Sequence, residues 1–163
     1  AEAGGLALAR GANIPTATLS HKDFPSRETF DAALRTIVDG FAPDLVVLAG
    51  FMRVLSAEFV GAYEGCLMNI HPSLLPAFTG LHTHARALEA GCKFAGCTVH
   101  FVTNQLDHGP IIAQSVVPIF PEDSEDSISA RVLIEEHRLL PQAVSDFCAG
   151  RLVVEGLRVR VTA

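Results

Sequence analysis

The chain has 163 residues, of which 49% are apolar, and its formal net charge is −6. This length suits one domain with a core of its own, and so high an apolar content argues against disorder. The acidic balance argues against nucleic acid as the main partner, because phosphate binding needs a basic surface.

No part of the sequence reads as a membrane segment or a signal peptide. The apolar runs stay short of the roughly 18 residues that a membrane helix requires. The four cysteines, Cys66, Cys92, Cys97 and Cys148, form no Cys-x-x-Cys pair. We interpret them as reduced thiols and predict a cytoplasmic protein with no membrane partner.

The first five predicted elements run from the start of the chain to residue 70. Helical periodicity predicts a helix over residues 1–15 and a second one over 26–44. Residues 45–50 (LVVLAG) form a continuous apolar run, which is typical of a central parallel strand covered on both faces. A short helix over 57–65 and a second buried strand over 66–70 are predicted to follow.

The next predicted elements reach residue 150. A helix is expected over residues 82–91, and the strands over 96–103 and 110–119 are expected to pair as a hairpin. The long helix predicted over 125–150 contains Pro141, where we expect a kink or a break.

Residues 151–161 are predicted to close the chain as a hairpin. The alternation of helices and buried strands predicts an α/β fold with a mostly parallel central sheet, flanking helices and antiparallel C-terminal strands. Doubly wound sheets usually begin with a strand and a Gly-rich phosphate loop, whereas this chain begins in a predicted helix. We therefore expect the opening β-α-β segment to be missing, and residues 1–163 to form one N-terminally incomplete domain.

Three polar side chains follow the ends of predicted strands. Asn69 and His71 come at the end of the strand over 66–70, and Asp107 lies in the turn after the strand over 96–103. Because ligands bind at the carboxyl ends of strands in open α/β sheets, we expect these side chains to meet there. Such a set suits acyl transfer: the amide stabilises an oxyanion, the imidazole moves a proton, and the carboxylate favours and orients imidazolium. The alternative is a histidine with structural hydrogen bonds only.

The prolines and the other histidines near these residues are weaker indicators of function. Pro72 and Pro76 are expected to hold the loop after the strand still. His82 and His84 are two residues apart, so on a helix they cannot share a metal as residues four apart do, and we expect no metal site. His100 lies within an alternating strand, where a hydrogen-bonded position near the core is expected.

The stretch NIHPSLLPAFTGLHTHARALEAG, followed by CTVHFVTNQLDHGPII, closely resembles the phosphoribosylglycinamide formyltransferases of purine biosynthesis. The similarity covers nearly the whole chain, and the signature SLLPAFTG together with the LDHGP turn is highly specific. Enzymes of this family pass a formyl group from 10-formyltetrahydrofolate to the amine of glycinamide ribonucleotide. Methionyl-tRNA formyltransferases and formyltetrahydrofolate hydrolases share Asn-x-His and the Asp, but GLHTHARALEAG fits the glycinamide branch best.

The resemblance implies a Rossmann-like formyltransferase fold and a role for each polar residue. Asn69 would hold the formyl oxygen, His71 would donate a proton, and Asp107 would keep His71 charged and help to order a water. The implied folate site consists of Arg27, Met52, Arg53, Val54, Leu55, Asn69, Thr103, Asn104, Gln105, Leu106 and Asp107. The apolar residues that would wall a flat pterin, and would otherwise be plain core, are Leu48, Val54, Leu55, Phe59, Leu67 and Val102. The implied nucleotide site consists of Leu133, Ile134, Glu135 and Glu136, with a solvated helix face as the alternative for Glu136.

The predicted activity is direct formyl transfer between small-molecule substrates, without a metal or a covalent enzyme intermediate, by a monomer or homodimer. The family's phosphate-binding loop, rich in Gly, Ser and Asn, has no counterpart in this sequence. Two rivals stay open: a formyltetrahydrofolate hydrolase, in which water replaces the amine and formate is released, and, because that loop is absent, a non-catalytic folate-binding fragment.

Overall fold

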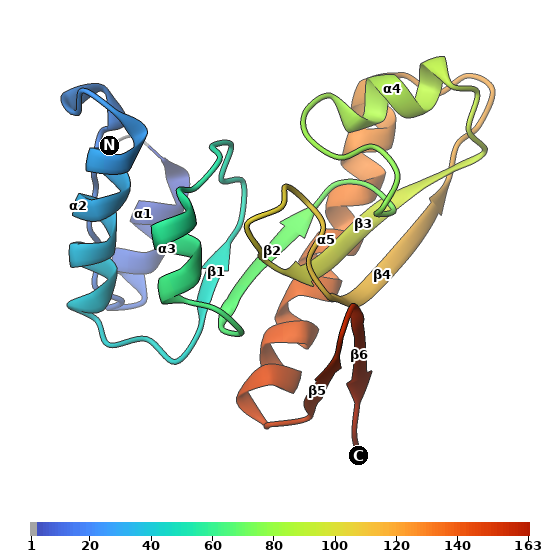
Figure 1. Ribbon diagram of the computed structural model, residues 1–163. Helices are drawn as coiled ribbons and strands as arrows, with labels where there is room; N and C mark the ends of the chain where they lie inside the picture. The colour runs from blue at the N-terminus through green and yellow to red at the C-terminus, as the bar shows by residue number, and fades with distance from the viewer. Residues whose placement is uncertain (1–2) are drawn as a thin grey trace. The chain divides into compact units, whose positions relative to one another are not determined.

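The structure is a computed structural model that describes residues 3–163 (Figure 1). The chain divides into two compact units, one that ends at Pro43 and one over Asp44–Ala163. A single domain over the whole chain stays a prediction.

The first unit contains two helices and a short 3₁₀ turn. Helix α1 spans Gly4–Gly11, the turn η1 spans His21–Asp23, and helix α2 spans Arg27–Asp39. Helix α2 begins at a capping box, in which the Ser26 hydroxyl accepts a hydrogen bond from the Thr29 amide at 3.3 Å. Both predicted helices are confirmed within narrower bounds.

The second unit is built on a six-stranded sheet with the strand order β1-β2-β3-β4-β6-β5. The strands are β1 (Val46–Leu48), β2 (Leu67–His71), β3 (Phe94–Phe101), β4 (Ile111–Pro118), β5 (Leu152–Glu155) and β6 (Arg158–Val161). Strands β3 and β4 pair antiparallel, as do β5 and β6, which confirms both predicted hairpins.

The sheet of this unit is mixed, which corrects the expectation of a mostly parallel one. Of its five described strand pairs, β1–β2 and β4–β6 are parallel and the other three are antiparallel. Strands β2 and β3 run in opposite directions because the chain between them stays at one end of the strands instead of crossing back along a face (Figure 1). The α/β class itself is confirmed.

Strand β1 lies at the edge of the described sheet, although its sequence suggested a covered central strand. Only three residues pair, and Val47 is 38% exposed. The reason is that an apolar run indicates a buried environment for the strand. It does not indicate how many neighbouring strands pair with it.

Three helices join these strands. They are α3 (Ala57–Ala62), α4 (Thr83–Glu89) and α5 (Glu125–Cys148). Helix α5 begins at a second capping box, formed by Ser124 and Ser127. It continues through Pro141, so the predicted break does not occur.

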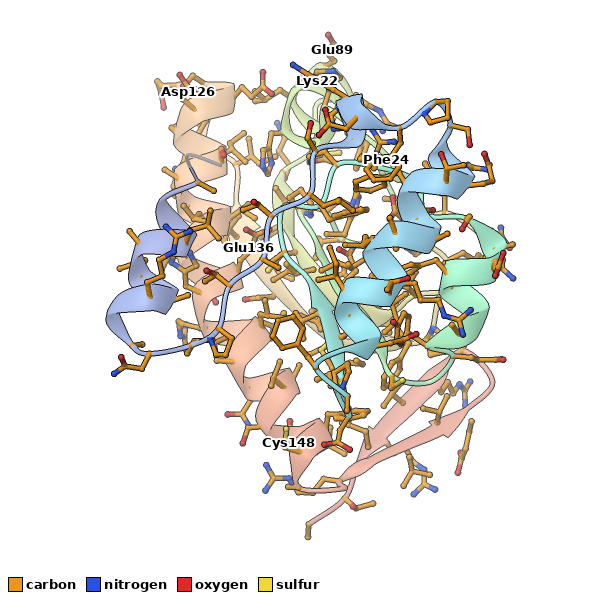
Figure 2. All side chains as sticks on the ribbon, turned by 90° about the vertical axis from the view of Figure 1, so that its left-hand side faces the viewer. Lys22, Phe24, Glu89, Asp126, Glu136 and Cys148 are labelled. Atoms are coloured by element: carbon orange, nitrogen blue, oxygen red, sulfur yellow. The ribbon has the colours of Figure 1, made fainter. Side chains whose placement is uncertain are left out.

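The core lies between α5 and the sheet. One cluster of buried side chains consists of Met68, Val99, Phe101, Ile112 and Ala143, and a second consists of Ala95, Cys97, Val117, Ile128 and Val132. Helix α5 contributes to both clusters; Figure 2 labels Asp126 near its start, Glu136 near its middle and Cys148 at its end. The core therefore fixes this helix against the strands that carry the candidate site.

All four cysteines are free thiols, as predicted from their spacing. Burial raises the pKa of the Cys97 thiol to about 11, whereas Cys148 is exposed. Within residues 3–163, the structure contains no helix that is both long and apolar enough to cross a membrane.

Candidate active site

Asn69 and His71 lie on the same face of β2, because side chains two residues apart on a strand point the same way. Asn69 is half-buried, and His71 is 6% exposed. In the neighbouring strand β3, His100 lies opposite Asn69 and Thr98 lies opposite His71. The strand pairing therefore gives each site residue a polar neighbour.

His100 fixes the orientation of the Asn69 amide. Its Nδ1 lies 2.8 Å from the Phe101 carbonyl oxygen, so Nδ1 carries the proton and donates it. Nε2 then accepts from the Asn69 Nδ2, at 3.3 Å. Burial lowers the pKa of His100, which favours the neutral ring, and the Phe101 carbonyl selects this tautomer. The expected hydrogen-bonded position of His100 is confirmed, and its partner is a site residue.

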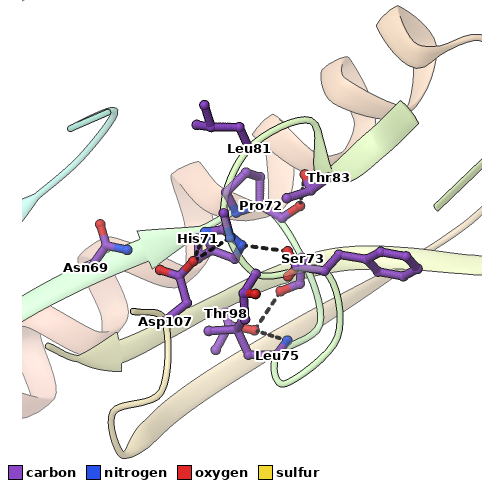
Figure 3. Close-up of polar contacts among 12 residues, drawn as sticks. Asn69, His71, Pro72, Ser73, Leu75, Leu81, Thr83, Thr98 and Asp107 are labelled. Carbon is purple, nitrogen blue, oxygen red and sulfur yellow. Dashed lines mark hydrogen bonds and ion pairs between the residues drawn. The ribbon is translucent and has the colours of Figure 1, made fainter. Parts of the chain in front are cut away.

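Both ring nitrogens of His71 face acceptors (Figure 3). Nε2 donates to the carbonyl oxygen of Phe78 at 3.0 Å, and Nδ1 lies 3.6 Å from Oδ2 of Asp107. The second distance is too long for a hydrogen bond, so that contact is electrostatic. Two acceptors match the doubly protonated imidazolium, which has a hydrogen on each nitrogen.

Asp107 is held in place by a backbone amide of the loop that follows β2. Its Oδ2 accepts a hydrogen bond from the Gly80 amide at 2.7 Å, and its side chain is 9% exposed. The residue has φ +49°, in the left-handed region where Asp and Asn are among the better-tolerated side chains. The turn between β3 and β4 thus delivers the carboxylate to His71, as predicted.

The loop after His71 is tied to the sheet by hydrogen bonds as well as stiffened by prolines. The Thr98 hydroxyl donates to the Ser73 carbonyl at 2.7 Å and accepts from the Leu75 amide at 3.1 Å. The Gln114 amide donates to Thr98 Oγ1 and to the Leu75 carbonyl, both at 2.9 Å. These contacts anchor residues 73–75 directly to β3 and β4.

A cavity of about 480 Å³ opens beside these residues. Its walls are residues 50–54, the end of β2, residues 80–84, Leu106, Asp107 and one face of α5. The helix contributes Glu125, Ser129, Val132, Leu133 and Glu136, which recur at helical spacing. The cavity is therefore bounded by the predicted catalytic residues on one side and by α5 on the other.

The predicted nucleotide residues divide between two faces of α5. Leu133 and Glu136 line the cavity, and burial raises the pKa of Glu136, against the opposing effects of His137 and His71. Ile134 is 62% exposed, and Glu135 accepts a hydrogen bond from Ser115 at 2.7 Å instead. Consecutive helix residues point about 100° apart, so four in a row cannot share one face.

A smaller pocket of about 90 Å³ adjoins the first and shares Asn69 and Asp107 with it. The predicted folate residues that line it are Arg53, Val54, Leu55, Asn69, Thr103, Asn104, Gln105, Leu106 and Asp107, while Met52 lines the larger cavity. Of the expected pterin wall, Leu48, Val54, Leu55 and Val102 line it, whereas Phe59 and Leu67 are buried outside both linings. Arg27 belongs to the first unit.

Several groups of the site could not be found by sequence reasoning alone. The Phe78 carbonyl and the Gly80 amide are backbone groups, and residue type does not predict where a backbone group points. Glu125 and Ser129 did carry a signal, because they precede Leu133 by eight and four residues on a predicted helix.

His84 is a further histidine in the cavity wall. Burial lowers the pKa of His84, with Glu125 opposing that shift, and its buried Nδ1 has no hydrogen-bond partner among the described residues. Across residues 3–163, His, Cys, Asp and Glu side chains form no group of three that could hold a metal ion.

The end of β2 presents an amide donor and an imidazole beside a carboxylate, where two pockets adjoin. This arrangement is typical of α/β enzymes that stabilise an oxyanion and move a proton. The particular family follows from comparison with known sequences. Residues 1–144 match the family model described as "Formyl transferase", and the chain belongs to this family.

Individual relatives agree with the family. The chain is 55% identical over 152 residues to "Phosphoribosylglycinamide formyltransferase" of Escherichia coli K12, covering 93% of this chain and 72% of that protein. It is 51% identical over 150 residues to the "Trifunctional purine biosynthetic protein adenosine-3" of Drosophila melanogaster, covering 92% of this chain and 11% of that protein. The crystal structure of glycinamide ribonucleotide transformylase 1 from Symbiobacterium toebii superposes with a TM-score of 0.96 at 47% identity, over 100% of this chain and 77% of that one. The Rossmann-like formyltransferase fold is thereby confirmed.

Proposed function

We propose that this chain transfers the formyl group of 10-formyltetrahydrofolate to the amine of phosphoribosylglycinamide, a step of purine biosynthesis. The single observation that carries the proposal is the position of Asn69 and His71, on one face of β2 beside Asp107 where the two pockets adjoin. The names of the relatives at 55% and 51% identity support this choice of substrates.

Asn69 stabilises the oxygen of the formyl group in this proposal. One of its two amide hydrogens is bound by His100, which leaves the other free to donate into the pocket. When the acceptor amine attacks the formyl carbon, the electron pair of the C=O bond moves to oxygen and the new C–N bond forms. A fixed amide donor stabilises that negative oxygen without reorganising during the reaction.

His71 supplies the proton that the leaving nitrogen requires. Its Nε2 hydrogen is committed to the Phe78 carbonyl, so Nδ1 is the atom that gives and takes the proton. As the bond to the folate nitrogen breaks, that nitrogen takes the electron pair and is protonated by Nδ1, directly or through a water beside Asp107. The proton lost by the attacking amine restores the imidazolium, so protons balance over the cycle.

The two pockets divide the substrates between them. We assign the pocket with Leu55 and residues 102–106 to the pterin of the donor, because Leu48, Leu55 and Val102 give it apolar walls for a flat ring. We assign the part of the larger cavity along Leu133 and Glu136 to the ribose of the acceptor, where the carboxyl group accepts hydrogen bonds from hydroxyl groups. Monomer or homodimer stays a prediction.

The deciding experiment supplies formyl-folate with and without phosphoribosylglycinamide and follows products by mass spectrometry. We expect formylated nucleotide to form, with little formate when the nucleotide is omitted. Formate release at the same rate without nucleotide would instead establish the hydrolase. Binding of folate without either product would establish the non-catalytic rival.

A further inference from the structure

Arg86 is an exposed residue of α4 whose side chain reaches back over the loop. Its Nη1 donates to the carbonyl oxygen of Thr79 at 2.6 Å and to that of Leu81 at 3.4 Å. Its guanidinium carbon lies 5.5 Å from the centre of the Phe78 ring, within cation–π range. One side chain therefore contacts three residues of the segment 78–81.

The same segment holds the catalytic pair. The Phe78 carbonyl accepts from His71, and the Gly80 amide donates to Asp107. Backbone groups of residues 78 and 80 thus bind the catalytic side chains. The carbonyl groups of Thr79 and Leu81 bind Arg86.

The conformation of this segment needs support from outside. Phe78, in the segment, and His82, directly after it, have φ of +55° and +56°, a region that residues other than Gly rarely adopt. Such a backbone persists only where surrounding contacts hold it. Thr98 and Gln114 hold the first part of the loop to the sheet, up to Leu75, and Arg86 contacts the part that follows.

We propose that Arg86 is a positioning residue: it fixes the backbone of residues 78–81 so that the Phe78 carbonyl and the Gly80 amide aim His71 and Asp107. The expected effect on kcat rests on the proposed formyl transfer. The expected effect on the backbone of residues 78–81 does not depend on it. Arg86 touches neither catalytic side chain, so its effect passes through the loop.

The test compares Arg86→Met, which keeps the length of the side chain and removes its donors, with wild type. We expect kcat to fall about tenfold while the KM of each substrate changes less than about threefold, since misaligned catalytic groups slow the chemistry more than they weaken binding. Hydrogen exchange of the Gly80 amide should speed up about tenfold, and the side-chain ¹⁵N signals of His71 should shift.

Two further variants separate a positioning role from a general effect. Arg86→Lys keeps a positively charged group that donates hydrogen bonds. It should recover part of kcat and part of the protection of the Gly80 amide from hydrogen exchange. Arg160→Met removes an exposed arginine of β6 that pairs with Glu155, and should leave every readout unchanged.

The possible outcomes are distinct. Wild-type kcat in Arg86→Met would overturn the proposal, and so would a loss of kcat with unchanged exchange at Gly80. If the wild-type chain shows no formyl transfer, the proposed function fails, and the Gly80 and His71 signals still decide whether Arg86 holds the loop.

Discussion

Asp107 meets three demands at one position: a left-handed backbone, a hydrogen bond to Gly80 and a charge facing His71. Few side chains satisfy the first two, and Asn is one that does, because it tolerates the same backbone and offers a carbonyl oxygen. A change to Asn therefore isolates the charge from the geometry.

We expect Asp107→Asn to fold as wild type and to lose about 100-fold in kcat, because the imidazolium loses its electrostatic partner. Steady-state kinetics measures the loss. Asp107→Ala also loses the Gly80 contact and should be slower still. An Asn variant with wild-type kcat would mean that the charge has no part in the reaction.

A second prediction concerns the strand residues themselves. Asn69→Ala should lower kcat by about 10²–10³, the usual cost of losing an oxyanion donor, and His71→Ala should be at least as slow. Because both act mainly in the transition state, the dissociation constant of a folate analogue should change less than about threefold. Calorimetry and steady-state kinetics measure the two quantities, and near-wild-type turnover in both variants contradicts the assignment.

At the scale of elements, the hairpin of β3 and β4 depends on a close approach of two backbones. A Cβ placed on Gly109 would lie 1.6 Å from the carbonyl oxygen of Phe101. The Phe101 amide in turn bonds to the Pro110 carbonyl at 2.9 Å, so neither backbone can move away cheaply. The absence of a side chain at residue 109 lets the turn return alongside β3 and deliver Asp107.

We therefore expect Gly109→Ala to destabilise the protein by about 3 kcal/mol or more, at the upper end of single substitutions, because the strands must separate. Urea unfolding followed by circular dichroism measures this. Gly61→Ala in α3 is the matched control, since a Cβ there meets nothing within 4 Å. Alanine favours a helix over glycine by about 0.5–1 kcal/mol, so that variant should be slightly stabilised. Equal effects at the two positions would contradict the steric argument.

The elements also show where prediction from sequence reached its limit. The apolar run before Asn69 and the turn around Asp107 were recognisable, since residue type alone marks buried strands and turns. The support from Phe78 and Gly80 was not, because it depends on backbone angles rather than on side chains. Strand direction between β2 and β3 depends on the path of the connection, and local periodicity carries no information about that path.

For the whole molecule, the buried His100 and the half-buried His84 make stability depend on pH. Burial is the main cause that lowers the pKa of His100 and of His84 below their ordinary value of 6.5. Between the lowered and the ordinary pKa, the unfolded chain binds more protons than the folded one, so stability falls as pH falls. The loss begins as the pH drops through about 6.5 and continues until the folded-state histidines are protonated as well.

We accordingly expect a smaller free energy of unfolding at about pH 5.5 than at about pH 7.5. His100→Asn removes one of the two groups and should flatten the curve over this range, although it costs some stability at every pH by disturbing Asn69. Denaturant titrations at a series of pH values measure the slope. A variant that keeps the full wild-type slope would show that His100 does not cause it.

The placement of α5 has a consequence for how such a protein diversifies. One stripe of the helix, with Ile128 and Ala143, packs into the core, while Ser129 and Glu136 on an adjacent stripe line the cavity, and Val132 contributes to both. Given the proposed ribose site, we expect substitutions along the second stripe to alter which acceptor is recognised while the folding free energy is largely spared. The catalytic strand lies elsewhere and need not change with them. We therefore expect directed evolution for new amines to succeed best when it begins on this surface of the helix.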